Sequence, residues 1–147
     1  MLTQTLSDLF ERDLKRCIDE LNLYKDEYDI WKTTSGINNS GGNLCLHLVG
    51  NLNHFIGAVL GNTGYVRHRD DEFSLKNVLR HDLILNIENC ILIIKNTFDK
   101  LSDEEMLHNF PLEKHGETVS NTHMLLHLYG HLNYHLGQIN YHRRMIS

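Results

Sequence analysis

Apolar residues recur every three to four positions in four long stretches of the chain, and this period is typical of amphipathic α-helices. The first stretch, for example, places Leu6, Phe10, Leu14 and Leu21 on one face and charged residues on the other. The four predicted helices cover about residues 3–28, 43–60, 75 or 79 to 101, and 120 or 121 to 144. Asn43 stands at the start of the second pattern, and we predict that it caps that helix.

The segments between the predicted helices carry the signals of loops. SGINNSGGN, residues 35–43, is rich in Gly, Asn and Ser. YVRHRDDEF, residues 65–73, is charged and has no helical period, so we predict a long connection there. Residues 102–119 contain Pro111 and Gly116, which argue against a full helix, although residues 103–108 could form one turn or a strand-like excursion.

The length and the layout of these elements together indicate one domain. A chain of 147 residues can enclose one hydrophobic core and is too short for two comfortable ones. Four long amphipathic helices predict an all-α fold, a four-helix bundle that occupies residues 1–147. The long connections allow crossovers, so the up-and-down order of the helices stays open.

Charge and cysteine content narrow the class of protein. The net charge is -5, and no predicted face is basic, so we expect no nucleic-acid partner. No stretch reaches about 18 consecutive apolar residues, and we expect no membrane span. Cys17, Cys45 and Cys90 are far apart and lie in apolar patterns, which predicts buried, reduced thiols in a cytoplasmic protein. The basic run at residues 142–144 is typical of a helix end.

The segment HLYGHLNYHLGQ, residues 127–138, is unusual because its histidines are spaced four apart. His127, His131 and His135 follow one another by about one helical turn, with His123 one turn earlier. On a helical wheel His131 and His135 lie at the edge of the apolar stripe, whereas His123 and His127 face solvent. Two imidazoles at positions i and i+4 can bind one metal ion, so His131 and His135 form a candidate metal site.

A third ligand would have to come from another helix, because a catalytic zinc site usually has three protein ligands and one open position. His47, in LCLHLVGNLNHF, is the best candidate, since it lies at the edge of the apolar arc of the second predicted helix. His54 is the alternative. The competing interpretation is a merely polar helix surface, because pairs with this spacing arise often in a chain with 11 histidines.

These residues also resemble a known family. YHLGQINY, with a histidine four residues before its own, is similar to the end of the last helix in the DinB/YfiT-like superfamily. HLVGN, followed by YVRHRDDEF, is similar to a block of one uncharacterised DinB-like branch, which has His-Leu-x-Gly-Asn and then Arg-x-Arg-Asp-x-Glu-Phe. The resemblance covers about residues 43–74 and 127–144. Asn53 and His54 depart from it, because that branch often has a Ser-Arg-like pair in this neighbourhood.

The resemblance implies a four-helix bundle in which three histidines hold a divalent metal. Carried over residue by residue, the ligands would be His47, His131 and His135. Members of the superfamily are similar to thiol-dependent transferases and isomerases or to hydrolases, many have no known activity, and dimers are common. We therefore expect a small-molecule substrate and a homodimer.

The expected chemistry depends on the open position of the metal, for which zinc and nickel are the best candidates. Such an ion lowers the pKa of bound water toward about 7 and deprotonates a bound thiol. Hydrolysis and transfer from an external low-molecular-weight thiol therefore stay open, as does a non-catalytic dimeric bundle with a structural or vestigial site. The candidate hydrogen-bond partners for the outer ring nitrogens are Asn51, Asp70, Glu72 and Gln138.

The two arginines of the 65–73 segment have two possible roles. Arg67 and Arg69 could cap the pocket and bind an anionic thiol cofactor, because a guanidinium matches a carboxylate in a bidentate geometry. Alternatively, they could form ion pairs with Asp70 and Glu72 that fix a long crossover.

Overall fold

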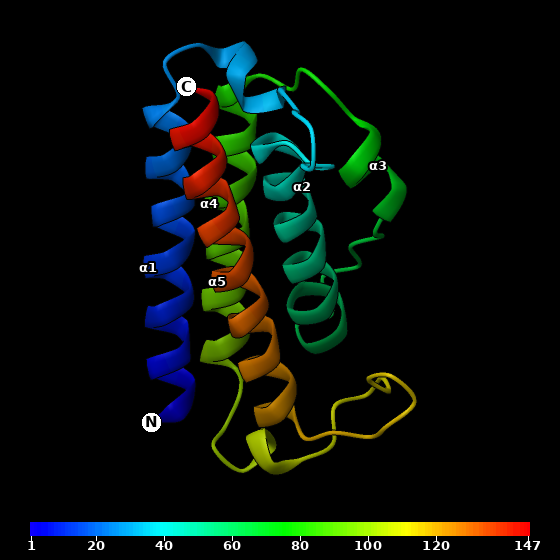
Figure 1. The fold of residues 1–147 in the computed structure, drawn as a ribbon. Helices are drawn as coiled ribbons and strands as arrows, with labels where there is room; N and C mark the ends of the chain where they lie inside the picture. Colours follow the sequence, from blue (N-terminus) through cyan, green and yellow to red (C-terminus); the bar gives the residue numbers. More distant parts are fainter.

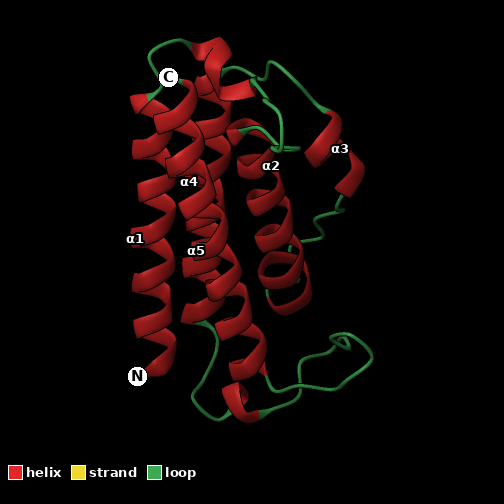
Figure 2. Ribbon diagram, in the orientation of Figure 1, coloured by secondary structure: helices red, strands yellow, loops and turns green.

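A computed structural model describes all 147 residues as an all-α fold with five α-helices (Figure 1). No β-strand is present, and the remaining residues form loops and short turns (Figure 2). The α-helices are α1 (Leu2–Leu23), α2 (Gly41–Leu52), α3 (Arg69–Ser74), α4 (Arg80–Asp99) and α5 (Asn121–Ile146). A π-helix at Asn53–Leu60 continues α2, and 3₁₀ turns lie at Glu27–Trp31 and Glu105–Leu107.

The four long helices pack around one hydrophobic core. Helix α1 contacts α4 and α5, and α2 contacts the same two helices. Helices α1 and α5 run in one direction and α2 and α4 in the other, so residues 61–79 return along the molecule before α4 begins (Figure 1). This crossover carries the short helix α3, which packs on the outside of α2.

The core consists of the apolar stripes that the sequence pattern predicts. In α1 the buried positions include Leu6, Phe10, Leu14 and Leu21. All three cysteines are free and buried, as expected. Burying one such leucine contributes about 1.5–3 kcal/mol, so the stripes supply the main drive for packing. No helix has the length and apolar character needed to cross a bilayer.

Two helix boundaries differ from the sequence prediction. Helix α1 ends at Leu23 rather than near residue 28, because the Asp26 side chain accepts a hydrogen bond from the Tyr28 N–H and starts a separate turn. Helix α2 begins earlier than predicted, with Ser40 as its cap, since the Ser40 hydroxyl accepts from the Asn43 N–H. The prediction that Asn43 caps α2 was therefore wrong.

The 65–73 segment is not entirely irregular, because its second half forms α3. Three acids in the first turn favour this helix N-terminus. The Asn43 side chain is fully buried and donates to the carbonyl oxygens of Glu72 and Leu75 at 3.0 and 2.9 Å. Asn43 thus attaches the end of α3 to the first turn of α2.

His142 has a different role from the one that the basic run at residues 142–144 indicates. Its Nε2 donates to the Lys32 carbonyl at 2.8 Å, so its Nδ1 accepts from the Tyr24 hydroxyl at 2.6 Å. Burial lowers the pKa of His142, although the carbonyl contact opposes this effect. The ring is therefore a neutral core group and not a cation at a helix end.

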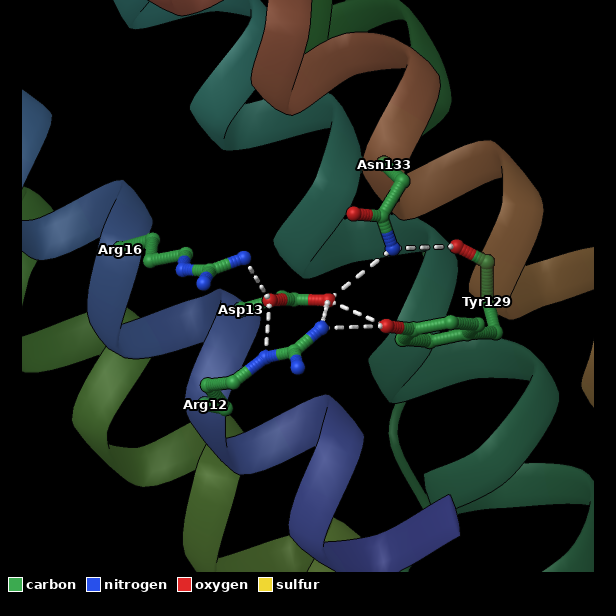
Figure 3. A network of polar contacts seen from close by, with 5 residues as sticks. All are labelled: Arg12, Asp13, Arg16, Tyr129 and Asn133. Atoms are coloured by element: carbon green, nitrogen blue, oxygen red, sulfur yellow. Dashed lines mark hydrogen bonds and ion pairs between the residues drawn. The ribbon is translucent and has the colours of Figure 1, made fainter.

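A buried carboxylate connects α1 to α5 (Figure 3). Asp13 is 0 % exposed, and Arg12 and Arg16 donate to its Oδ1 at 2.9 and 3.0 Å. On the α5 side, the Tyr129 hydroxyl and the Asn133 amide donate to Oδ2. Donors from both helices thus converge on one charge, which fixes the register between them.

Candidate metal centre

Three imidazole rings meet in the seam between α2 and α5. His47 comes from α2, and His131 and His135 come from successive turns of α5. The Nε2 atom of His131 lies 3.1 Å from the Nε2 atoms of both other rings. The potential ligand atoms of the three histidines all lie within 4.8 Å of one another. His54, the alternative third ligand, is not part of this group and packs its ring on Phe55 instead.

Two of the rings are oriented by hydrogen bonds to their outer nitrogens. The Nδ1 of His47 lies 3.0 Å from Glu72 Oε1, and the Nδ1 of His135 lies 2.7 Å from Gln138 Oε1. An ionised carboxylate only accepts hydrogen bonds, so His47 carries its proton on Nδ1, and the amide oxygen favours the same tautomer for His135. The neutral forms of both rings therefore direct Nε2 lone pairs toward His131.

The third ring, His131, cannot donate a hydrogen bond to the Nε2 lone pairs of both His47 and His135. His131 has at most one proton on Nε2, and its Nδ1 is buried without any hydrogen-bond partner. Burial lowers the pKa of His131 to about 4, and the neighbouring His135 and His47 add to this effect, so the ring is neutral at pH 7. A divalent cation would accept all three lone pairs. Nitrogen ligands of a tetrahedral zinc lie about 3.3 Å apart, close to the 3.1 Å that separates His131 Nε2 from the Nε2 atom of each other ring.

Glu72 is held in place from two sides. Arg67 donates through Nε to Oε2 at 2.8 Å and through Nη2 to Oε1 at 2.9 Å, which forms a bidentate ion pair. The carboxylate also lies directly against the backbone of α2 at Gly50, where a Cβ atom would come within 2.0 Å of Glu72 Oε2. The glycine of HLVGN therefore makes room for the carboxylate that orients His47.

We expect Gly50→Ala to weaken metal binding about 10–100-fold, the usual cost of losing the partner that orients a ligand histidine. The added methyl group displaces Glu72 from His47 and leaves the three histidines unchanged. Competition with a chromophoric chelator measures the zinc affinity. Gly137→Ala is the matched control, because a Cβ there meets nothing within 4 Å. Equal affinities in the two variants would contradict this role of Glu72.

Of the four candidate hydrogen-bond partners for the outer ring nitrogens, two lie beside such a nitrogen and two do not. Glu72 and Gln138 lie within hydrogen-bond distance of the outer nitrogens of His47 and His135, as described above. Asp70 is exposed and contacts none of the three histidines, and the buried Oδ1 of Asn51 has no hydrogen-bond partner. The sequence pattern could not separate these residues, because the positions of α3 and α2 relative to each other decide which side chain reaches the ring.

The two arginines have separate environments. Arg67 is bound to Glu72, so the predicted ion pair exists for this residue. Arg69 is exposed, forms no ion pair, and lies over the Phe73 ring with its guanidinium carbon 5.9 Å from the ring centre. Both line a pocket of about 360 Å³ that also borders His47 and His131.

Sequence reasoning missed part of this pocket. Glu113, Lys114 and His115 reach it from the loop that contains the Lys114–Glu117 bridge, and His127 reaches it from α5. His127 is exposed, as the helical wheel predicts, and the same is true of His123. Nothing in the sequence indicates that the loop at residues 113–115 folds back beside the histidines, because it shares the pocket with residues that are far away in the sequence.

These features define the protein as an all-α chain with a three-histidine group that could hold a metal ion. A family model described as "Protein of unknown function (DUF1572)" matches residues 2–147, and the chain belongs to this family. A comparison with curated proteins gave no match.

Proposed function

We propose that this protein is a metal-dependent enzyme in which His47, His131 and His135 hold a divalent cation, most simply zinc or nickel. The observation that carries the proposal is the convergence of three Nε2 atoms while Glu72 and Gln138 orient two of the rings. Three protein ligands leave a coordination position open, which is the pattern of catalytic zinc sites. The pocket beside His47 and His131 gives a ligand access to that position.

The bound cation would supply a lowered pKa for a water or thiol at the open position. The residues of this chain would do the rest. Glu72 keeps the proton on His47 Nδ1, Arg67 fixes Glu72, and Gln138 orients His135. We further propose that Arg67 and Arg69 attract the anionic end of a low-molecular-weight thiol, with Arg69 as the cation that is free of an ion pair.

The resemblance to the DinB/YfiT-like superfamily supports a finer assignment. It favours a single four-helix-bundle domain over residues 1–147, a small-molecule substrate and a homodimer. The three free, buried cysteines support a cytoplasmic location. Within that superfamily, thiol transfer to a small electrophile is the activity that suits a cationic pocket best. Metal-dependent hydrolysis uses the same centre and is the second candidate.

The proposal is tested by the metal content of protein purified without a histidine tag. Mass spectrometry should find about one zinc or nickel per chain, and adding the metal should raise the melting temperature, because an ion that binds only the folded state stabilises it. Loaded protein is then assayed with an external thiol and a small electrophile, and separately with ester substrates. Protein that takes up neither metal after incubation would refute the enzyme proposal.

A further inference from the structure

Two pockets border the three-histidine centre, one on each side along the seam between α2 and α5. The first, which we call the basic pocket, is the one that contains Arg69 and Lys114, and it lies beside His47 and His131. The second, the uncharged pocket, has about 390 Å³ and borders His135. Both volumes fall in the range of small-molecule sites.

The order of residues along the two helices places the centre between the pockets. On α5 the basic pocket uses Met124 to His131, and the uncharged pocket uses His135 to Met145. Helix α2 runs in the opposite direction and contributes Leu44 to the uncharged pocket and Asn51 to the basic one. Figure 1 shows the same separation, since the 36–39 loop lies near the end of α5 and the 111–118 loop near its start.

The basic pocket has an excess of positive charge. Arg67 is neutralised by Glu72, but Arg69 and Lys114 form no ion pair with any carboxylate. Glu113 is the one acid in the lining. His115 and His127 add ring nitrogens that can donate or accept hydrogen bonds. Guanidinium and ammonium groups without partners beside a pocket attract carboxylates and phosphates.

The uncharged pocket has the opposite character. No Asp, Glu, Lys or Arg lines it. Apolar surface comes from Ile37, Leu44, Tyr141 and Met145, and amide groups come from Asn38, Asn39 and Gln138. Such a lining suits an uncharged molecule with an apolar body and one or two hydrogen-bonding groups, because a buried charge would find no partner there.

We propose that the centre takes two different ligands at once, a small organic anion in the basic pocket and an uncharged, partly apolar molecule in the uncharged pocket. This inference deepens the proposed function and rests on it, because two ligands that meet at one metal position are what a two-substrate enzyme requires and a hydrolase does not. It assigns a role to Lys114, which lies outside the sequence motifs, and to Tyr141, the last residue of YHLGQINY.

The test is an NMR titration of the ¹⁵N-labelled full chain, both loaded with Zn²⁺ and metal-free. The probes are 3-mercaptopropionate, an anion, and benzamide, an uncharged ring with an amide. We expect 3-mercaptopropionate to shift the signals of residues 67–69 and 113–115 and benzamide to shift those of residues 36–39 and 141–145. Saturation with one probe should leave the dissociation constant of the other within about threefold.

Variants test the two pockets separately. A variant that loses one probe but still binds the other is not misfolded. Arg69→Gln with Lys114→Gln should weaken 3-mercaptopropionate about fivefold or more, the effect of a partly exposed ion pair, and leave benzamide unchanged. Tyr141→Asp should weaken the binding of benzamide and leave that of 3-mercaptopropionate unchanged. Lys25→Gln with Lys100→Gln removes the same charge away from both pockets and should change neither constant.

Several outcomes would overturn the inference. Competition between the probes, one common set of shifted signals, or loss of both ligands in one variant would show a single site. Equal weakening of 3-mercaptopropionate in the control variant would show that only net charge matters. If the two probes bind separately but the chain takes up no metal, the two-ligand arrangement holds and the proposed metal function fails.

Discussion

Replacing His131 with alanine is expected to abolish tight metal binding. Its Nε2 is the atom that lies 3.1 Å from both other ring nitrogens, so its loss leaves His47 and His135 without the ligand between them. The loss of affinity should exceed the ~10–100-fold typical for removing a partner outside the ligand set. Competition with a chelator measures the affinity, and mass spectrometry measures the metal retained.

His123→Ala is the matched control, because His123 is an exposed histidine two turns earlier on the same helix. The control should keep the wild-type affinity, and His54→Ala should keep it too. Circular dichroism of the metal-free proteins shows whether each variant still folds. A His131→Ala chain that folds and binds zinc as tightly as wild type would refute the three-histidine centre.

Asp13→Ala is expected to cost about 3 kcal/mol of unfolding free energy, since deleting one member of a buried charge network typically costs about 3–5 kcal/mol. The two arginines are half exposed and can return to water, which limits the loss. The Tyr129 hydroxyl and the Asn133 amide instead lose their acceptor at the interface between α1 and α5 (Figure 3). Urea denaturation measures the change.

The loss of unfolding free energy in Asp13→Ala should depend on pH in a defined direction. Burial raises the pKa of Asp13, but the hydrogen bonds from Arg12, Tyr129 and Asn133 together lower it more, so the net pKa is depressed. A depressed folded-state pKa means that the stabilisation is present above the unfolded value of about 3.9 and is lost as the pH falls below it. The difference between wild type and Asp13→Ala should therefore be constant from pH 7 to 5 and shrink near pH 3.

Asp19→Ala serves as the control for this measurement, because Asp19 is an exposed acid on the same helix. It should change the unfolding free energy by less than about 0.5 kcal/mol. A difference between wild type and Asp13→Ala that persists undiminished below pH 3 would show that packing, and not the charge network, carries the effect.

The local patterns that the sequence contains predicted most of the helices. The stripes of α4 and α5 repeat over many turns, so their faces and approximate ends were correct. The errors fell where a single side chain decides, as with Asp26 after α1 and Ser40 before α2. Helix α3 was missed because a helix of six residues is too short to show a period, and much of its stability comes from contacts with Asn43.

The spacing within one helix also fixed half of the candidate centre. His131 and His135 lie one turn apart, and any helix there places their rings together. The third member was a choice between His47 and His54, which lie seven residues apart on the same side of the second helix, two turns from each other. Sequence periodicity cannot choose between them, because both have nearly the same angular position.

By itself, the sequence determined that the chain is helical, which faces are buried, and which histidine pair shares a face, since all of these follow from short-range periodicity. Tertiary structure decided that His47 meets that pair, that Glu72 reaches its ring across Gly50, and that Lys114 lies beside the centre. The physical reason is the same in each case. Axial alignment of packed helices and the path of long loops depend on contacts between residues 25 to 84 positions apart, which no local pattern records.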